Sequence, residues 1–184
     1  YPLTLERLSL RDLNSEEPVT SSSFAHLKNL KHLELSFCYQ TNTKFVASIL
    51  KTLPSLSSHL QSLSLNLLGT QELYSSPYLS GLKVLCHLRQ LKLQLQCMKF
   101  NAFENVLRVF QNCSLKHLTL IALVQSQEQL IPIAKFVQKL NNLEDLKLKV
   151  TCQNSFETSE GHTELLNQID NLSLLRNLSV SIIS

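Results

Sequence analysis

The sequence predicts an α/β solenoid: a right-handed stack of about seven strand–helix repeats, with a parallel β-sheet on the concave face and helices on the convex face. A recurring leucine pattern and apolar segments of helical spacing between its copies support this prediction. The pattern L-x-x-L-x-L occurs six times in 184 residues, and a seventh copy ends in valine. Its middle leucines are Leu8, Leu33, Leu63, Leu91, Leu118, Leu146 and Leu178, which are 25 to 32 residues apart. Such a period indicates a repeat protein.

Each copy of the pattern predicts a β-strand. Its leucines alternate with other residues, and successive side chains of a strand point to opposite faces of a sheet. One face of the predicted sheet is therefore lined by leucine, and the other carries the residues between the leucines.

The segments between the strands have apolar residues three or four positions apart, which is typical of amphipathic helices. Phe45, Ile49 and Leu53 define one such helix. Three more are defined by their apolar positions, and residues 78–86 form a shorter candidate. Those positions are Phe100, Phe103, Leu107 and Phe110; Leu130, Ile133, Val137 and Leu140; and Leu165, Leu166, Ile169 and Leu172.

Two of these helices have a predicted start. We expect the third to begin near Ile131, because Pro132 fits only the first turn of a helix. Thr163 is the expected N-cap of the last helix, because its hydroxyl can accept a hydrogen bond from a free backbone N–H.

A strand–helix unit of this size cannot bury its apolar side alone, so neighbouring units must stack. Parallel strands joined by helices take right-handed crossovers, which produce a curved solenoid. Leucine accounts for 41 of the 184 residues, as expected when the same buried position recurs in every repeat.

These repeats resemble those of leucine-rich-repeat proteins, and their length of about 28 residues resembles the ribonuclease-inhibitor-like subclass. The resemblance covers residues 3–183 and implies a protein-binding surface. That family usually has Asn or Cys three positions after the last leucine, where only Cys38 fits here. The other residues at that position are Leu13, Leu68, Gln96, Leu123, Thr151 and Ile183. We therefore expect irregular loops and uneven curvature.

No enzymatic motif is present, so we expect no catalytic residue, cofactor or metal site. The three glycines are far apart, which argues against a phosphate-binding loop. Five widely spaced cysteines without a C-x-x-C pair suit a reducing compartment, and we expect an intracellular, cytoplasmic protein. Cys38 and Cys97 are expected to be structural thiols, and His32 and His117 to be exposed histidines too far apart to act as a pair.

We expect residues 1–184 to form one domain of a longer chain, because the first residue is not Met and neither end has a capping repeat. Further repeats or a neighbouring chain would cap these ends. A net charge of +3 makes nucleic acid an improbable partner, and no apolar run is long enough to cross a membrane.

The predicted function is a non-catalytic protein-interaction or scaffold module, as a subunit of a larger assembly. The alternative is the recognition arm of a regulatory protein, of the ubiquitin-ligase-receptor or sensor type, with its activity outside this segment. Residues 14–23, 69–77 and 151–161 are loops that could bind instead. The candidate concave face contains Arg7, Arg11, His32, Glu34, Gln90, Lys92, His117, Asp145, Lys147 and Lys149.

Overall fold

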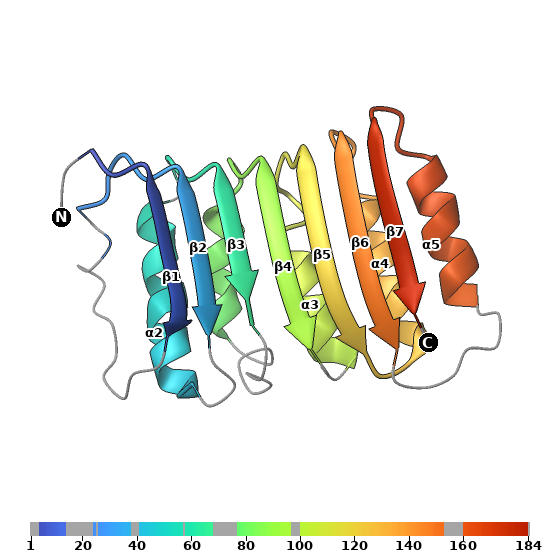
Figure 1. The fold of residues 1–184 in the computed structure, drawn as a ribbon, viewed down its shortest axis with the longest axis horizontal. Helices are drawn as coiled ribbons and strands as arrows, with labels where there is room; N and C mark the ends of the chain where they lie inside the picture. The colour runs from blue at the N-terminus through green and yellow to red at the C-terminus, as the bar shows by residue number, and fades with distance from the viewer. Residues whose placement is uncertain are drawn as a thin grey trace.

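Seven parallel strands form one sheet in the order of the chain, from β1 to β7 (Figure 1). The computed structural model describes residues 4–13, 24, 26–37, 41–56, 58–67, 77–96, 100–152 and 160–183. The strands are β1 (Arg7–Leu13), β2 (His32–Phe37), β3 (Ser62–Asn66), β4 (Gln90–Gln96), β5 (His117–Val124), β6 (Asp145–Cys152) and β7 (Asn177–Ile183). Each strand begins within a copy of the leucine pattern, as predicted.

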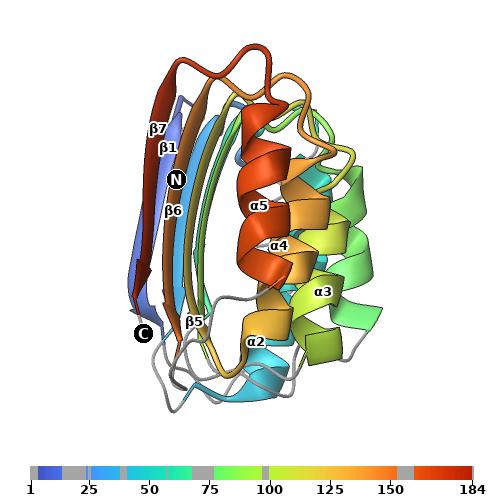
Figure 2. The ribbon, with the colours of Figure 1, turned by 90° about the vertical axis from the view of Figure 1, so that its right-hand side faces the viewer.

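The helices cover one face of this sheet (Figure 2). The α-helices are α2 (Thr43–Thr52), α3 (Phe100–Val109), α4 (Leu130–Val137) and α5 (Glu160–Asp170). Short 3₁₀ helices are η1 (Leu53–Leu56), η3 (Pro77–Val84) and η4 (Gln127–Gln129). In Figure 2 the outer strands β1 and β7 lie further from the helices than β5 does, so the open face of the sheet is concave.

The core lies between the sheet and the helices. Leucines of the repeated pattern are almost fully buried in the central strands; Leu118 and Leu120 of β5 are 1% and 0% exposed. From the helical side, Phe103 and Phe110 pack into the same core at 1% and 0% exposure. The alternation in the sequence therefore produces one continuous apolar layer.

The pairing register is constant from β2 to β7, with the middle leucines opposite one another in every pair. Between β1 and β2 the register shifts after Leu10, so that Leu13 pairs with Phe37. From β4 onward, the position that usually holds Asn or Cys in the family continues the strand: Gln96 pairs with Leu123, and Leu123 with Thr151. The expected irregular loops lie mostly outside the described residues.

The predicted helices agree with the structure, with differences at their ends. Helix α4 begins at Leu130, one residue before the expected start, and Pro132 lies in its first turn. The candidate at 78–86 is the 3₁₀ helix η3, a form common in such short segments. Helix α5 begins at Glu160, so the prediction that Thr163 is the N-cap was wrong: Thr163 lies inside the first turn.

The C-terminal side of the solenoid exposes apolar side chains. Leu178 of β7 lies in the row of middle leucines but is 53% exposed, because β7 pairs only with β6. Leu166 of α5 is 43% exposed, so it does not belong to the core as its spacing suggested. That further repeats or a neighbouring chain cap the ends of the solenoid stays a prediction.

Candidate functional site

The concave face carries the side chains that alternate with the buried leucines. The sheet register aligns them in rows that run across the strands. One row is Arg7, His32, Ser62, Gln90, His117, Asp145 and Asn177. A second row joins Ser9, Glu34, Ser64, Lys92, Thr119, Lys147 and Ser179. All ten candidate residues lie on this face and are at least partly exposed.

At the β1–β2 end, the carboxylate of Glu34 is engaged within the chain. Ser9 Oγ donates a hydrogen bond to Glu34 Oε2 at 2.8 Å, and Arg11 Nη2 donates to the same oxygen at 3.2 Å. The hydrogen bonds from Ser9 and Arg11 lower the pKa of Glu34. Arg11 therefore has a carboxylate partner on the neighbouring strand, although its side chain is exposed like that of Arg7.

At the β5–β7 end, Asp145 is the centre of a hydrogen-bonded ladder across three strands. Asn177 Nδ2 donates to Asp145 Oδ1, and His117 Nδ1 contacts Asp145 Oδ2. The hydrogen bond from Asn177 lowers the pKa of Asp145, and that from His117 lowers it further. Both carboxylate oxygens have partners within the chain, so this carboxylate holds neighbouring strands together.

His117 and Asp145 were both expected on the concave face, but their pairing was not predicted. The signal was present, because consecutive members of a row face each other on adjacent strands. His32 and His117 lie on non-adjacent strands, as expected, and so do Glu34 and Asp145.

Three lysines remain on the concave face: Lys92 on β4, and Lys147 and Lys149 on β6. We call them the concave lysine patch. All three are exposed, and their side chains form no hydrogen bond or ion pair with any described residue. Lys92 and Lys147 both pair in register with Thr119, so they are two strand spacings apart, or roughly 10 Å. Gln90 lies beside this patch on β4 and is also exposed.

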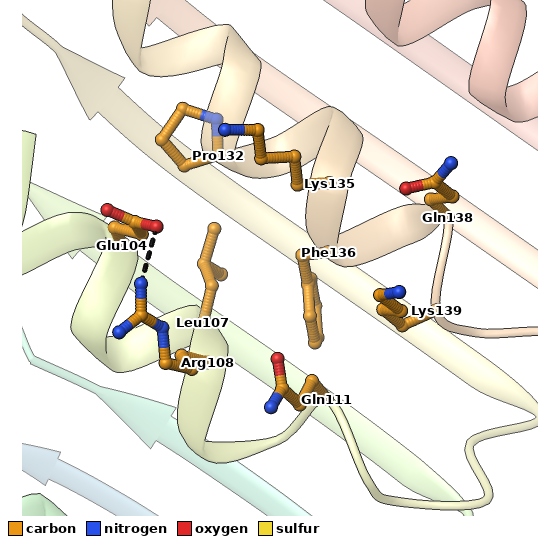
Figure 3. A pocket seen from close by; sticks show the side chains of 9 residues that line it. All are labelled: Glu104, Leu107, Arg108, Gln111, Pro132, Lys135, Phe136, Gln138 and Lys139. Atoms are coloured by element: carbon orange, nitrogen blue, oxygen red, sulfur yellow. Dashed lines mark hydrogen bonds and ion pairs between the residues drawn. The ribbon is translucent and has the colours of Figure 1, made fainter.

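The convex side has a shallow groove of about 340 Å³ between α3 and α4 (Figure 3). Leu107 and Phe136 form its apolar floor but are only 1% and 3% exposed. At the border of this convex groove, Arg108 Nη2 donates a hydrogen bond to Glu104 Oε1 at 2.7 Å. The groove therefore offers little apolar surface to a ligand.

Among the described residues, no group of three or more His, Cys, Asp or Glu side chains could hold a metal ion. Within that part of the chain, Cys113 is buried, and burial, followed by the proximity of Cys86, raises its pKa to about 11. A thiol in that state is a poor nucleophile. Cys38 and Cys97 lie outside the described residues, as do most residues of the three loops considered as binding surfaces.

The repeated strand–helix unit, the single seven-stranded parallel sheet and the buried leucine rows define a leucine-rich-repeat solenoid. No protein-family model matches the chain, and no curated protein sequence matches it. A solved structure of internalin C2 from Listeria monocytogenes is similar at 17% sequence identity and a TM-score of 0.42, over 95% of this chain and 80% of that chain.

No helix within the described ranges combines the length and the apolar character that crossing a membrane requires.

Proposed function

We propose that this protein is a non-catalytic interaction module whose concave face binds a protein partner. In this proposal the concave lysine patch contacts an acidic surface of that partner. The observation that carries it is the exposure of Lys92, Lys147 and Lys149, whose side chains form no ion pair or hydrogen bond with any described residue. Glu34 and Asp145 on the same face, by contrast, accept hydrogen bonds within the chain.

The dimensions of the face are compatible with such a role. Seven strands spaced by 4.8 Å span roughly 29 Å, and six residues of strand span roughly 20 Å. The resulting area of about 600 Å² approaches the 800 Å² that each partner typically buries in a stable complex. The two concave rows contain no Phe, Tyr or Trp, so aromatic anchors of these types would have to come from the partner.

Charge would then contribute mainly to the rate and specificity of association. Exposed cations that lack internal partners attract an acidic surface over a distance of about 10 Å at 0.1 M salt. Binding should therefore weaken as the salt concentration rises.

Several finer assignments remain proposals. They are membership of the ribonuclease-inhibitor-like subclass, a place in a larger assembly or in a regulatory recognition arm, and a cytoplasmic location. Each of them is compatible with a partner on the concave face.

The test uses charge reversal on matched faces. One variant carries Lys92→Glu, Lys147→Glu and Lys149→Glu on the concave face. The control carries Lys83→Glu, Lys135→Glu and Lys139→Glu, three exposed lysines on the helical side. Both variants change the net charge equally, and thermal unfolding checks that both fold.

Each protein is immobilised and incubated with extract of the cells that produce it. We expect a partner that the wild type and the control capture and that the concave variant loses. A partner that the concave variant retains, or that both variants lose equally, would contradict the proposal.

A further inference from the structure

A second hollow, of about 490 Å³, lies at the edge of the sheet where the strands begin, which is the upper edge in Figure 1. We call it the rim groove. It is formed by residues that precede strands β2 to β5, and no Asp or Glu is among the described residues that line it. Its cationic lining consists of Lys28, Lys31 and Arg89, joined by His59 and His87.

Backbone hydrogen bonds set the spacing of the lining. Gln61 N donates to Lys31 O at 2.9 Å, and Arg89 N donates to Gln61 O at 2.8 Å. Lys31, Gln61 and Arg89 therefore occupy three successive repeats. At about 4.8 Å for each strand spacing, Lys31 and Arg89 are roughly 10 Å apart along the rim.

Elsewhere along this rim the chain pairs its cations with carboxylates from the neighbouring repeat. Lys31 Nζ donates to Glu6 Oε1 at 2.7 Å, and Lys116 Nζ donates to Glu144 Oε1 at 2.5 Å. These bonds lower the pKa of both Glu6 and Glu144. At both ends of this edge of the sheet, cations therefore alternate with carboxylates from one repeat to the next.

In the middle of the rim this alternation lacks its acidic members. Arg89 lies between Gln61 and Lys116, so neither neighbouring repeat supplies a carboxylate at its level. The side chains of Arg89 and Lys28 are exposed and form no ion pair or hydrogen bond with any described residue. The groove lies at this gap.

We propose that the rim groove binds an acidic peptide segment of a protein partner, whose carboxylates pair with Arg89 and Lys28. Lys28 belongs to the same repeat as Lys31, which is two strand spacings, or roughly 10 Å, from the repeat of Arg89. An extended peptide advances about 3.3 Å per residue, so carboxylates about three residues apart span the distance between these two repeats. Ser58 and Gln61 also line the groove, and their side chains can form hydrogen bonds with the peptide backbone.

A peptide fits the lining better than a nucleic acid does. Sequence-tolerant binding of single-stranded nucleic acid relies on aromatic side chains that stack on bases and on a continuous positive track. No aromatic residue other than histidine lines the rim groove. This site is separate from the concave lysine patch, and it does not require that the concave face bind anything.

The probe is a fluorescent nine-residue peptide with three glutamates separated by one or two glycines. A peptide with glutamine in place of glutamate serves as its neutral control. Fluorescence anisotropy at low salt measures its affinity for the whole chain, for a Lys28→Glu/Arg89→Glu variant and for a Lys135→Glu/Lys139→Glu variant with the same charge change on the convex side.

We expect the rim variant to bind the acidic peptide about tenfold more weakly than wild type, since two exposed ion pairs become repulsive contacts. The convex variant should lose at most a small part of that effect. Cys86 supplies a second measurement, because it is exposed and lines the groove. The acidic peptide should slow its alkylation by iodoacetamide, and the glutamine peptide should not.

Three results would overturn this inference. The first is equal affinity of wild type and rim variant. The second is loss of binding in the concave lysine variant while the rim variant binds normally, which would place the peptide on the concave face. The third is displacement of the peptide by a uridine oligonucleotide that binds more tightly. The capture experiment on the concave face can fail or succeed independently of all three.

Discussion

Replacing Leu118 by alanine tests the packing of the solenoid most sharply. Leu118 is 1% exposed in the central part of the sheet, and its neighbours in register, Leu91 and Leu146, are each 2% exposed. Truncation removes buried methyl groups and leaves a cavity in a layer that cannot collapse freely. We expect the free energy of unfolding to fall by about 3 to 4 kcal/mol.

Leu178 provides the matched control, because it occupies the same row on the last strand. It is 53% exposed, so Leu178→Ala removes about half as much buried surface and creates no enclosed cavity. We expect this change to cost about 1 kcal/mol.

Equilibrium unfolding in urea, followed by circular dichroism and by a second probe, measures both variants. Coincident transitions of the two probes justify a two-state free energy, which long repeat arrays do not always obey. Equal losses for Leu118→Ala and Leu178→Ala would refute the reasoning, because they would mean that the C-terminal edge is covered as completely as the centre.

Three further results are expected. Asp145→Asn should flatten the loss of stability in acid. Because the pKa of Asp145 is lowered in the folded protein, its contribution is complete above the unfolded pKa of about 3.9 and is lost as the pH falls through the folded value. Urea midpoints between about pH 2 and 5 provide the test. Iodoacetamide at pH 8 should modify exposed Cys86 well before buried Cys113, as peptide mass spectrometry would detect; equal rates would contradict the burial of Cys113. Gln129→Ala should lower the free energy of unfolding by about 1 to 3 kcal/mol, because the buried Gln129 Oε1 accepts hydrogen bonds of 2.7 and 3.3 Å from two backbone N–H groups. Gln138→Ala, on the exposed surface, should change it little. Thermal or urea unfolding measures both variants.

The strands and their register could be predicted from the sequence because one signal recurs in every repeat. A strand has a period of two, so a leucine at the wrong register would place the whole apolar set on the solvent face. The seven copies therefore determine which residues face the core. The rows of the concave face follow directly from them, as the pairing of Lys92 with Thr119 illustrates.

Helix ends and edge effects could not be predicted in the same way. The start of α5 depends on the residues before it, and a plausible N-cap at Thr163 competed with an earlier start at Glu160. The exposure of Leu166 depends on what packs against α5, which periodicity along the helix does not reveal.

The charged contacts across strands were missed for another reason. The sequence argument considered distant residues such as His32 and His117, whereas these contacts join neighbours in adjacent repeats. Reading each row across the strands predicts the ladder at Asp145 and the paired ends of the rim. The same reading identifies the cations that have no acidic neighbour.

Lysine footprinting of the complex tests most directly whether the concave face binds the partner. The free protein and the complex with a captured partner are acetylated briefly, and mass spectrometry gives the rate at each lysine. We predict that acetylation of Lys92, Lys147 and Lys149 slows in the complex while that of Lys135 and Lys139 does not change. Unchanged rates at the three concave lysines, with protection at the two convex ones, would contradict the account.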